Sequence, residues 1–259
     1  MTASFATQIG SLARRSVLRT LRQPAQVVPA LFFPLLLVAV NGGGLDAVTE
    51  LPGFPTDHYV DFVLAVAFVQ GGLFAAGSAG TNIANDVETG FLNRLSLTPL
   101  RRAALLIGQL AGVVALGLIQ AATYLIAGLI AGVSIHAGVA GALVIIALAL
   151  LISLGFGSIG AFVALRTGSG EAVQGVFPLM FAALFLSSMS LPRNLIETDW
   201  FRTVATWNPV SYMIEGIRSL VIEGWDEQAL LLGFACAGGV ALIALVAASG
   251  ALRTRMART

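Results

Sequence analysis

Six apolar runs, each about as long as a lipid bilayer is thick, constrain the fold of this chain more than any other feature. A helix that spans a bilayer needs about 20 mostly apolar residues. The runs cover residues 26–45, 58–83, 103–132, 138–165, 172–191 and 228–252. Only 10% of the 259 residues are charged, against about 25% in a soluble domain. We therefore predict an all-α polytopic membrane protein with six transmembrane helices, forming a single domain over residues 1–259.

Arginines are distributed unevenly over the segments that connect these runs. All fourteen basic residues are arginine, and eleven of them lie in the N-terminal stretch, the 84–102 loop, the 166–171 loop and the C-terminal tail. The alternate segments hold Arg193, Arg202 and Arg218, together with ten acidic residues. Because arginine-rich loops stay on the cytoplasmic side, we expect both termini and the 84–102 loop to be cytoplasmic.

The stretch "GSLARRSVLRTLRQ", residues 10–23, has the pattern of a basic amphipathic helix. One ridge at helical spacing is apolar and consists of Ile9, Ala13, Val17 and Leu21. The opposite face carries Arg15, Arg19 and Arg22. Helices of this kind lie in the plane of the lipid headgroups. Two interpretations remain open, a simple membrane anchor and an elbow helix that positions the first span at the surface of a partner.

A long polar stretch, "NDVETGFLNRLSLTPLRR", interrupts the apolar sequence between the second and third runs. Asn85 or Asp86 is a suitable cap for a helix start, and Pro99 is a suitable stop. Val87, Phe91 and Leu95 would share one face of this helix. So short a helix is marginally stable alone in water. We expect it either to dock on a partner or to pack on the chain's own spans.

Several kinds of chemistry have no residues to support them here. A Walker A loop needs a lysine at the phosphates, and the chain has no lysine. The two histidines, His58 and His136, lie at opposite ends of spans, and Cys236 is the single cysteine. We expect no catalytic residues, no metal site and no cofactor in this chain, and no binding of nucleic acid. Energy for uphill transport would have to come from another subunit.

Two segments carry a resemblance to a known family. They are "DVETGFLNRLSLTPLRRAALLIGQL" and "PRNLIETDWFRTVATWNPVSYMIEGIRSLVIEGW". Together with the six-span layout, they make the chain similar to the ABC-2 type exporter permeases, including the drug- and antibiotic-resistance permeases of actinobacteria. The resemblance covers nearly the whole chain. One departure is "FLSS" at Phe185–Ser188, where the family often has a glycine in this turn.

The resemblance implies a half-transporter in the cytoplasmic membrane of a bacterium. Two permease chains, identical or homologous, would pair in the bilayer and bind two separate ATPase subunits, which hold ATP and Mg²⁺. The polar stretch would be the cytoplasmic coupling helix, with an ATPase-subunit interface formed by Asp86, Val87, Glu88, Gly90, Phe91, Leu92, Arg94, Leu95 and Pro99. Outer re-entrant helices before the last span would form a gate that includes Trp200, Asn208, Pro209 and Arg218.

Aromatic side chains supply a hypothesis for the cargo. Phe177, Phe181 and Phe185 form a ridge on the fifth run, with Met180 beside it, and Phe68, Gln70 and Phe74 lie on the second run. Such surfaces suit apolar or amphiphilic compounds, so we expect export of a drug, an antibiotic or a lipid. The same ridge is equally typical of core packing or of a lipid-facing surface. The alternatives are a permease for lipid-linked glycans and a membrane scaffold or sensor that transports nothing.

Overall fold

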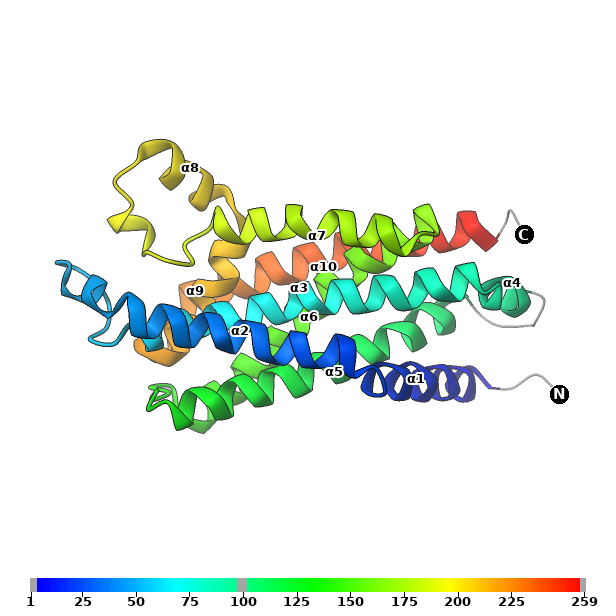
Figure 1. Ribbon diagram of the computed structural model, residues 1–259, viewed down its shortest axis with the longest axis horizontal. Coiled ribbons are helices and arrows are strands. Elements are labelled where there is room, and N and C mark those ends of the chain that lie inside the picture. Colours follow the sequence, from blue (N-terminus) through cyan, green and yellow to red (C-terminus); the bar gives the residue numbers. More distant parts are fainter. Residues whose placement is uncertain (1–3, 97–101, 257–259) are drawn as a thin grey trace.

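The computed structural model describes residues 4–96 and 102–256, and all the regular structure in these residues is helical. Most helices run along the long axis of an elongated bundle (Figure 1). In chain order they are α1 (Phe5–Leu21), α2 (Pro24–Gly44), α3 (Tyr59–Glu88), α4 (Phe91–Ser96), α5 (Arg102–Ile130), α6 (Gly138–Thr167), α7 (Gly170–Phe185), α8 (Asp199–Trp207), α9 (Pro209–Ile222) and α10 (Glu227–Met256). Two 3-10 turns, η1 (Asp46–Glu50) and η2 (Arg193–Leu195), lie between them. The predicted all-α fold is confirmed.

Five of these helices, α2, α3, α5, α6 and α10, are long and apolar enough to cross a membrane. Each agrees with a predicted run to within about five residues. The predicted fifth span, 172–191, corresponds to α7, which has only 16 residues and ends at Phe185. At a rise of 1.5 Å per residue, α7 is about 24 Å long, shorter than the roughly 30 Å of bilayer hydrocarbon. The count of six spans therefore stays a prediction.

Helix α3 lies at the centre of the bundle and is buried along most of its length. It packs against α2, α5, α6, α7 and α9. The fully buried Tyr59, Phe62, Phe68 and Leu73 anchor it in the core. Because lipid tails are as apolar as these side chains, close packing rather than exclusion of water has to hold such helices together.

Glycines allow the closest of these approaches. A Cβ atom at Gly160 of α6 would overlap the backbone carbonyl oxygen of Ala76 on α3. A Cβ atom at Gly112 of α5 would lie 2.6 Å from the Oγ of Ser16 on α1. Small residues at such crossings let two helix backbones pack directly on each other in lipid.

The two ends of the bundle carry different elements (Figure 1). The start of α1, the end of α10 and α4 lie at one end, which we call the terminal end. The segments with η1, η2, α8 and α9 lie at the opposite end, which we call the distal end. The start of α1, the end of α10 and the α3–α4 turn therefore share a side, as the arginine distribution predicts. Which side of the membrane this is stays a prediction.

Candidate functional site

The turn between α3 and α4 lies at the terminal end, where the coupling helix was expected. The predicted helix start at Asn85 or Asp86 is wrong, because both residues belong to the last turns of α3. The chain turns at Gly90, whose φ of +67° is the left-handed conformation that glycine adopts most easily. Helix α4 then begins at Phe91 and has six residues. The predicted stop, Pro99, lies outside the described residues.

Apolar and charged side chains of this turn point in different directions. Leu92 is buried, and Val87 and Leu95 pack against the apolar cluster between the terminal ends of the long helices. Glu88 and Arg94 are exposed. The turn therefore presents charged side chains outward, while Val87, Leu92 and Leu95 pack on the chain's own bundle.

Asp86 joins three helices through its side chain and is only 2% exposed. Arg15 of α1 donates to both of its carboxylate oxygens, at 3.0 and 2.8 Å. Arg19 of α1 donates to Oδ1 at 2.6 Å, and Gln109 of α5 donates to Oδ2 at 2.7 Å. A buried carboxylate needs such partners to offset the loss of water. Asp86 thus uses its charge within this chain.

The amphipathic helix α1 turns a different face inward from the one that the apolar ridge predicted. Its buried side chains are Leu12, Ser16 and Thr20, one position away from the expected ridge. Arg15 and Arg19 turn toward Asp86, while Arg22 is exposed. The guanidinium of Arg15 also lies 3.8 Å from the ring centre of Phe91, so α1 contacts both α3 and α4.

Aromatic rings from α2, α3 and α7 form a continuous cluster. Phe74 lies 5.5 Å from Phe177 and 5.9 Å from Phe33, measured between ring centroids. Phe181 lies 5.0 Å from Phe177 and 6.2 Å from Phe33, and Phe185 extends the row. Phe33 and Phe185 are exposed, whereas Phe177 and Phe181 are half-buried. Phe33 was not predicted to belong to this cluster, because a single ring on α2 shows no periodic pattern.

Three other predicted cargo residues lie in the packed interior. Phe68 is 2% exposed and contacts Tyr124 of α5, with ring centroids 5.6 Å apart. It lies about 120° around α3 from Phe74, because each residue turns the helix by 100°. Gln70 and Met180 are also buried. These three side chains do not belong to the aromatic cluster of Phe74.

A cavity of about 220 Å³ lies beside the aromatic cluster, between α2, α3 and α7. Phe74 and Phe177 form its apolar wall. Its polar wall consists of Gln26, Ser78, Thr81 and Gln174. The cavity thus combines aromatic surface with hydrogen-bonding groups.

Asn208 and Pro209 divide the segment before α10 into two helices, as predicted. The Oδ1 of Asn208 accepts from Val210 N at 2.9 Å and caps the start of α9. Its Nδ2 donates to the carbonyl oxygens of Ala183 and Leu186 at the end of α7. Trp200 is exposed on α8, whereas α9 is buried in the bundle.

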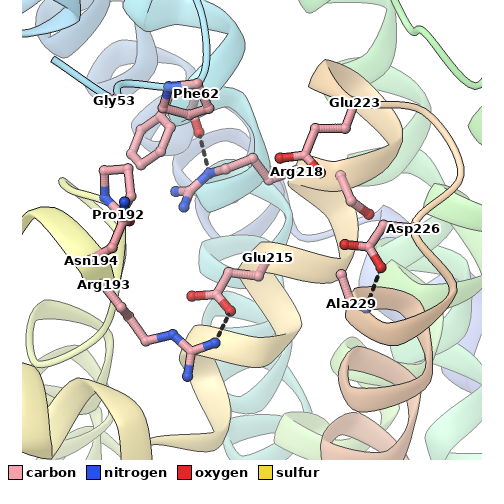
Figure 2. A pocket seen from close by; sticks show the side chains of 12 residues that line it. Gly53, Phe62, Pro192, Arg193, Asn194, Glu215, Arg218, Glu223, Asp226 and Ala229 are labelled. Atoms are coloured by element: carbon pink, nitrogen blue, oxygen red, sulfur yellow. Dashed lines mark hydrogen bonds and ion pairs between the residues drawn. The ribbon is translucent and has the colours of Figure 1, made fainter.

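A second cavity, with a volume of about 530 Å³, lies at the distal end. It opens between α9, the start of α3, η2 and the start of α10 (Figure 2). Five charged side chains line it, Arg193, Glu215, Arg218, Glu223 and Asp226. Burial lowers the pKa of Arg193, but its pairing with Glu215 at 2.6 Å outweighs this, so the pKa lies above its ordinary value. Among these residues, only Arg218 was predicted to belong to a site.

Comparisons with known proteins agree on one family. The sequence model described as "ABC-2 type transporter" matches residues 7–222. The "Putative transport permease ycf38" of Porphyra purpurea is 27% identical over 213 residues, which are 82% of this chain and 72% of the relative. The "Probable doxorubicin resistance ABC transporter permease protein DrrC" of Mycobacterium tuberculosis (strain CDC 1551 / Oshkosh) is 24% identical over 222 residues, 85% of this chain and 79% of the relative.

Proposed function

Because this chain belongs to the ABC-2 type transporter family, we propose that it is the permease subunit of an ATP-driven exporter for hydrophobic or amphiphilic compounds. Membership in this family implies work with ABC ATPase partners. The relative from Mycobacterium tuberculosis, whose name refers to doxorubicin resistance, supports a drug-like cargo.

The observation that carries the choice of cargo is the aromatic cluster and the cavity beside it. Phe74 and Phe177 offer ring faces and edges to an apolar group, and rings bury large areas of a bound compound. Gln26 and Gln174 also line the cavity and supply amide groups. A mostly apolar pocket with a few polar groups is typical of sites for small organic compounds. An amphiphile can place its apolar part on the rings and its polar part at the amides.

The terminal end is the proposed docking place for the ATPase. The exposed Glu88 and Arg94 present charges there, beside the turn that carries α4. The ATPase subunits would hold ATP and Mg²⁺ and face the cytoplasm, together with both termini. A second permease chain, identical or homologous, would complete the transporter. The fixed contact of α1 with α3 and α4 would carry motion of the docked turn into the bundle.

The test uses this chain purified with its ATPase partner and reconstituted into vesicles. ATPase activity is measured against the concentration of doxorubicin and of a cationic dye as probes. In Phe181→Ala, the probe concentration that gives half-maximal stimulation should rise. The rise should correspond to a loss of roughly 1–3 kcal/mol in apparent binding free energy, which is the transfer energy of one large apolar side chain. The basal rate should be unchanged, because Phe181 lies far from α4.

Phe234→Ala is the matched control. Phe234 is also a half-buried phenylalanine, but it lies on α10, outside the aromatic cluster. Stimulation by neither probe in the wild type would contradict an exporter of such compounds and favour the glycan permease or the scaffold. Equal shifts in both variants would remove the aromatic cluster from the cargo path.

A further inference from the structure

The distal cavity contains a buried cation that makes no ion pair with any described carboxylate. Arg218 is 6% exposed, and its guanidinium lies 3.4 Å from the ring centre of Phe62. Its Nε donates to Phe62 O at 3.1 Å, and its Nη2 donates to the carbonyl oxygens of Ser188 and Met189 at 3.1 and 3.4 Å. Among the described residues, it has no ion pair, and its Nη1 has no hydrogen bond.

Neutral carbonyl groups orient this guanidinium, and Glu215 attracts it only from beyond ion-pair distance, because its carboxylate is paired with Arg193. Taking an unpaired charge out of water is costly unless an opposite charge compensates it. Figure 2 shows the Arg218 side chain reaching into the cavity between Phe62 and Glu215. Its free Nη1 is therefore the donor available to an anionic group that enters.

Negative charge gathers at the exposed edge of the same cavity. Glu215 is already paired with Arg193 and accepts a hydrogen bond from Ser188 Oγ. Asp226 caps the start of α10 through one oxygen, Oδ1, which accepts from Gln228 N and Ala229 N. Glu223 is exposed and has no ion pair among the described residues. The cavity is thus positive at its base, at Arg218, and negative at its edge, at Glu223 and Asp226.

This separation of charge excludes the simplest ligands. In the described part of the chain, no three histidine, cysteine or acidic side chains come together as a metal site would require. A simple anion would meet the two carboxylates at the edge, and a simple cation would meet Arg218 at the base. A ligand that carries both charges, with its anion inward and its cation outward, is attracted at both positions.

We propose that the distal cavity binds a phosphate group that carries an ammonium, as in the ethanolamine headgroup of a phospholipid or in free phosphoethanolamine. The phosphate accepts hydrogen bonds from Arg218, because phosphate oxygens match the geometry of a guanidinium group. The ammonium lies at Glu223 and Asp226. The volume of about 530 Å³ is within the range of small-molecule pockets. This site lies at the opposite end of the bundle from α4, goes beyond the proposed transport and does not depend on it.

Binding is tested by calorimetric titration of the purified chain in a neutral sugar-based detergent. The probes are a short-chain phosphatidylethanolamine, a phosphatidylglycerol with the same chains, and free phosphoethanolamine. We expect saturable binding of the ethanolamine lipid, roughly tenfold tighter than binding of the glycerol lipid, which lacks the ammonium. Binding of free phosphoethanolamine as well identifies a soluble ligand, whereas binding of the lipid alone identifies a headgroup held with its chains.

Variants separate the two charges. Glu223→Gln should lower the affinity for the ethanolamine lipid roughly tenfold and leave the affinity for the glycerol lipid unchanged. Arg218→Gln should lower the affinity for both lipids. Glu227→Gln is the control, because Glu227 is exposed on the first turn of α10 and does not line the cavity. If Arg218→Gln fails to fold, Glu223→Gln still decides. Equal affinity for the two lipids in the wild type, no binding of any probe, or an unchanged Glu223→Gln would overturn the proposal.

Discussion

A single buried carboxylate, Asp86, organises the terminal end of the molecule. Burying its charge would be unfavourable alone, but four hydrogen bonds from two arginines and a glutamine compensate it. The sequence shows the basic face of α1 but does not show that it turns inward, because helical periodicity defines faces and not neighbours. Gln109 was visible as one polar residue in an apolar span, and its partner was not. Residue types were therefore predictable here, whereas pairings were not.

Asp86→Asn should lower the thermal stability of the purified protein. The amide keeps the shape of the side chain but leaves Arg15 and Arg19 without an anion. Breaking a fully buried pair costs about 3–5 kcal/mol. Here we expect about 1–3 kcal/mol, because the Arg15 side chain is 37% exposed and water screens it. The change is read as a shift in Tm of the chain in detergent at a fixed scan rate.

Glu88→Gln is the control for Asp86→Asn, since it removes an exposed carboxylate two residues away. Its effect should stay within about 0.5 kcal/mol. In the Asp86→Asn background, Arg19→Gln should cost less than it does in the wild type, because its partner is already gone. A full and equal cost in both backgrounds would show that the ion pair contributes nothing.

Among the elements, the long helices were predictable and the end of α7 was not. Bilayer thickness sets the length of an apolar run, and the chain's Gly and charged residues delimit most runs. Residues 186–191, "LSSMSL", belong to the predicted run, yet they leave the helix. The side-chain amide of Asn208 donates hydrogen bonds to the carbonyl oxygens of Ala183 and Leu186. The backbone amide of Ser188 donates to Ser211 Oγ. These distant hydrogen bonds stabilise the end of α7. The resemblance pointed to a turn at Phe185–Ser188, but the local sequence does not reveal the partners that hold it.

Gly160→Ala should loosen the packing of α6 on α3. The added Cβ would overlap a backbone carbonyl, that of Ala76, so α6 would have to move as a whole. Overpacking of this kind costs about 1–3 kcal/mol. Gly239→Ala on α10 is the matched control, because a Cβ there meets nothing within 4 Å. It should be neutral or slightly stabilising, since alanine favours a helix more than glycine does, by about 1 kcal/mol. Equal Tm values for the two variants would contradict this contact.

At the scale of the whole molecule, the sequence predicts which residues gather at each end but not which helices touch. Every long helix runs along the bundle, so the order of the runs alone brings the start of α1, the α3–α4 turn and the end of α10 to the same end (Figure 1). The aromatic cluster needed the side-by-side packing of α2, α3 and α7, which the sequence does not give. The distal cavity likewise joins four segments of the chain. Its charge pattern could not be read from the composition of any one of them.

The arginine distribution predicts the orientation of this bundle in the membrane. Arg94→Cys, Glu50→Cys and Glu197→Cys place single thiols at exposed positions, Arg94 at the terminal end and the other two in the distal-end segments. A Cys236→Ser background removes the native thiol. An impermeant maleimide added to intact cells should label residues 50 and 197, and it should label residue 94 only after the cells are broken. Arginine-rich segments resist transfer across the bilayer, and the terminal end holds most of the arginines. The labelling of broken cells is the control for reactivity, since all three thiols must then react. Labelling of residue 94 in intact cells would invert the orientation, place the exposed Glu88 and Arg94 outside, and leave a cytoplasmic ATPase no access to the α3–α4 turn.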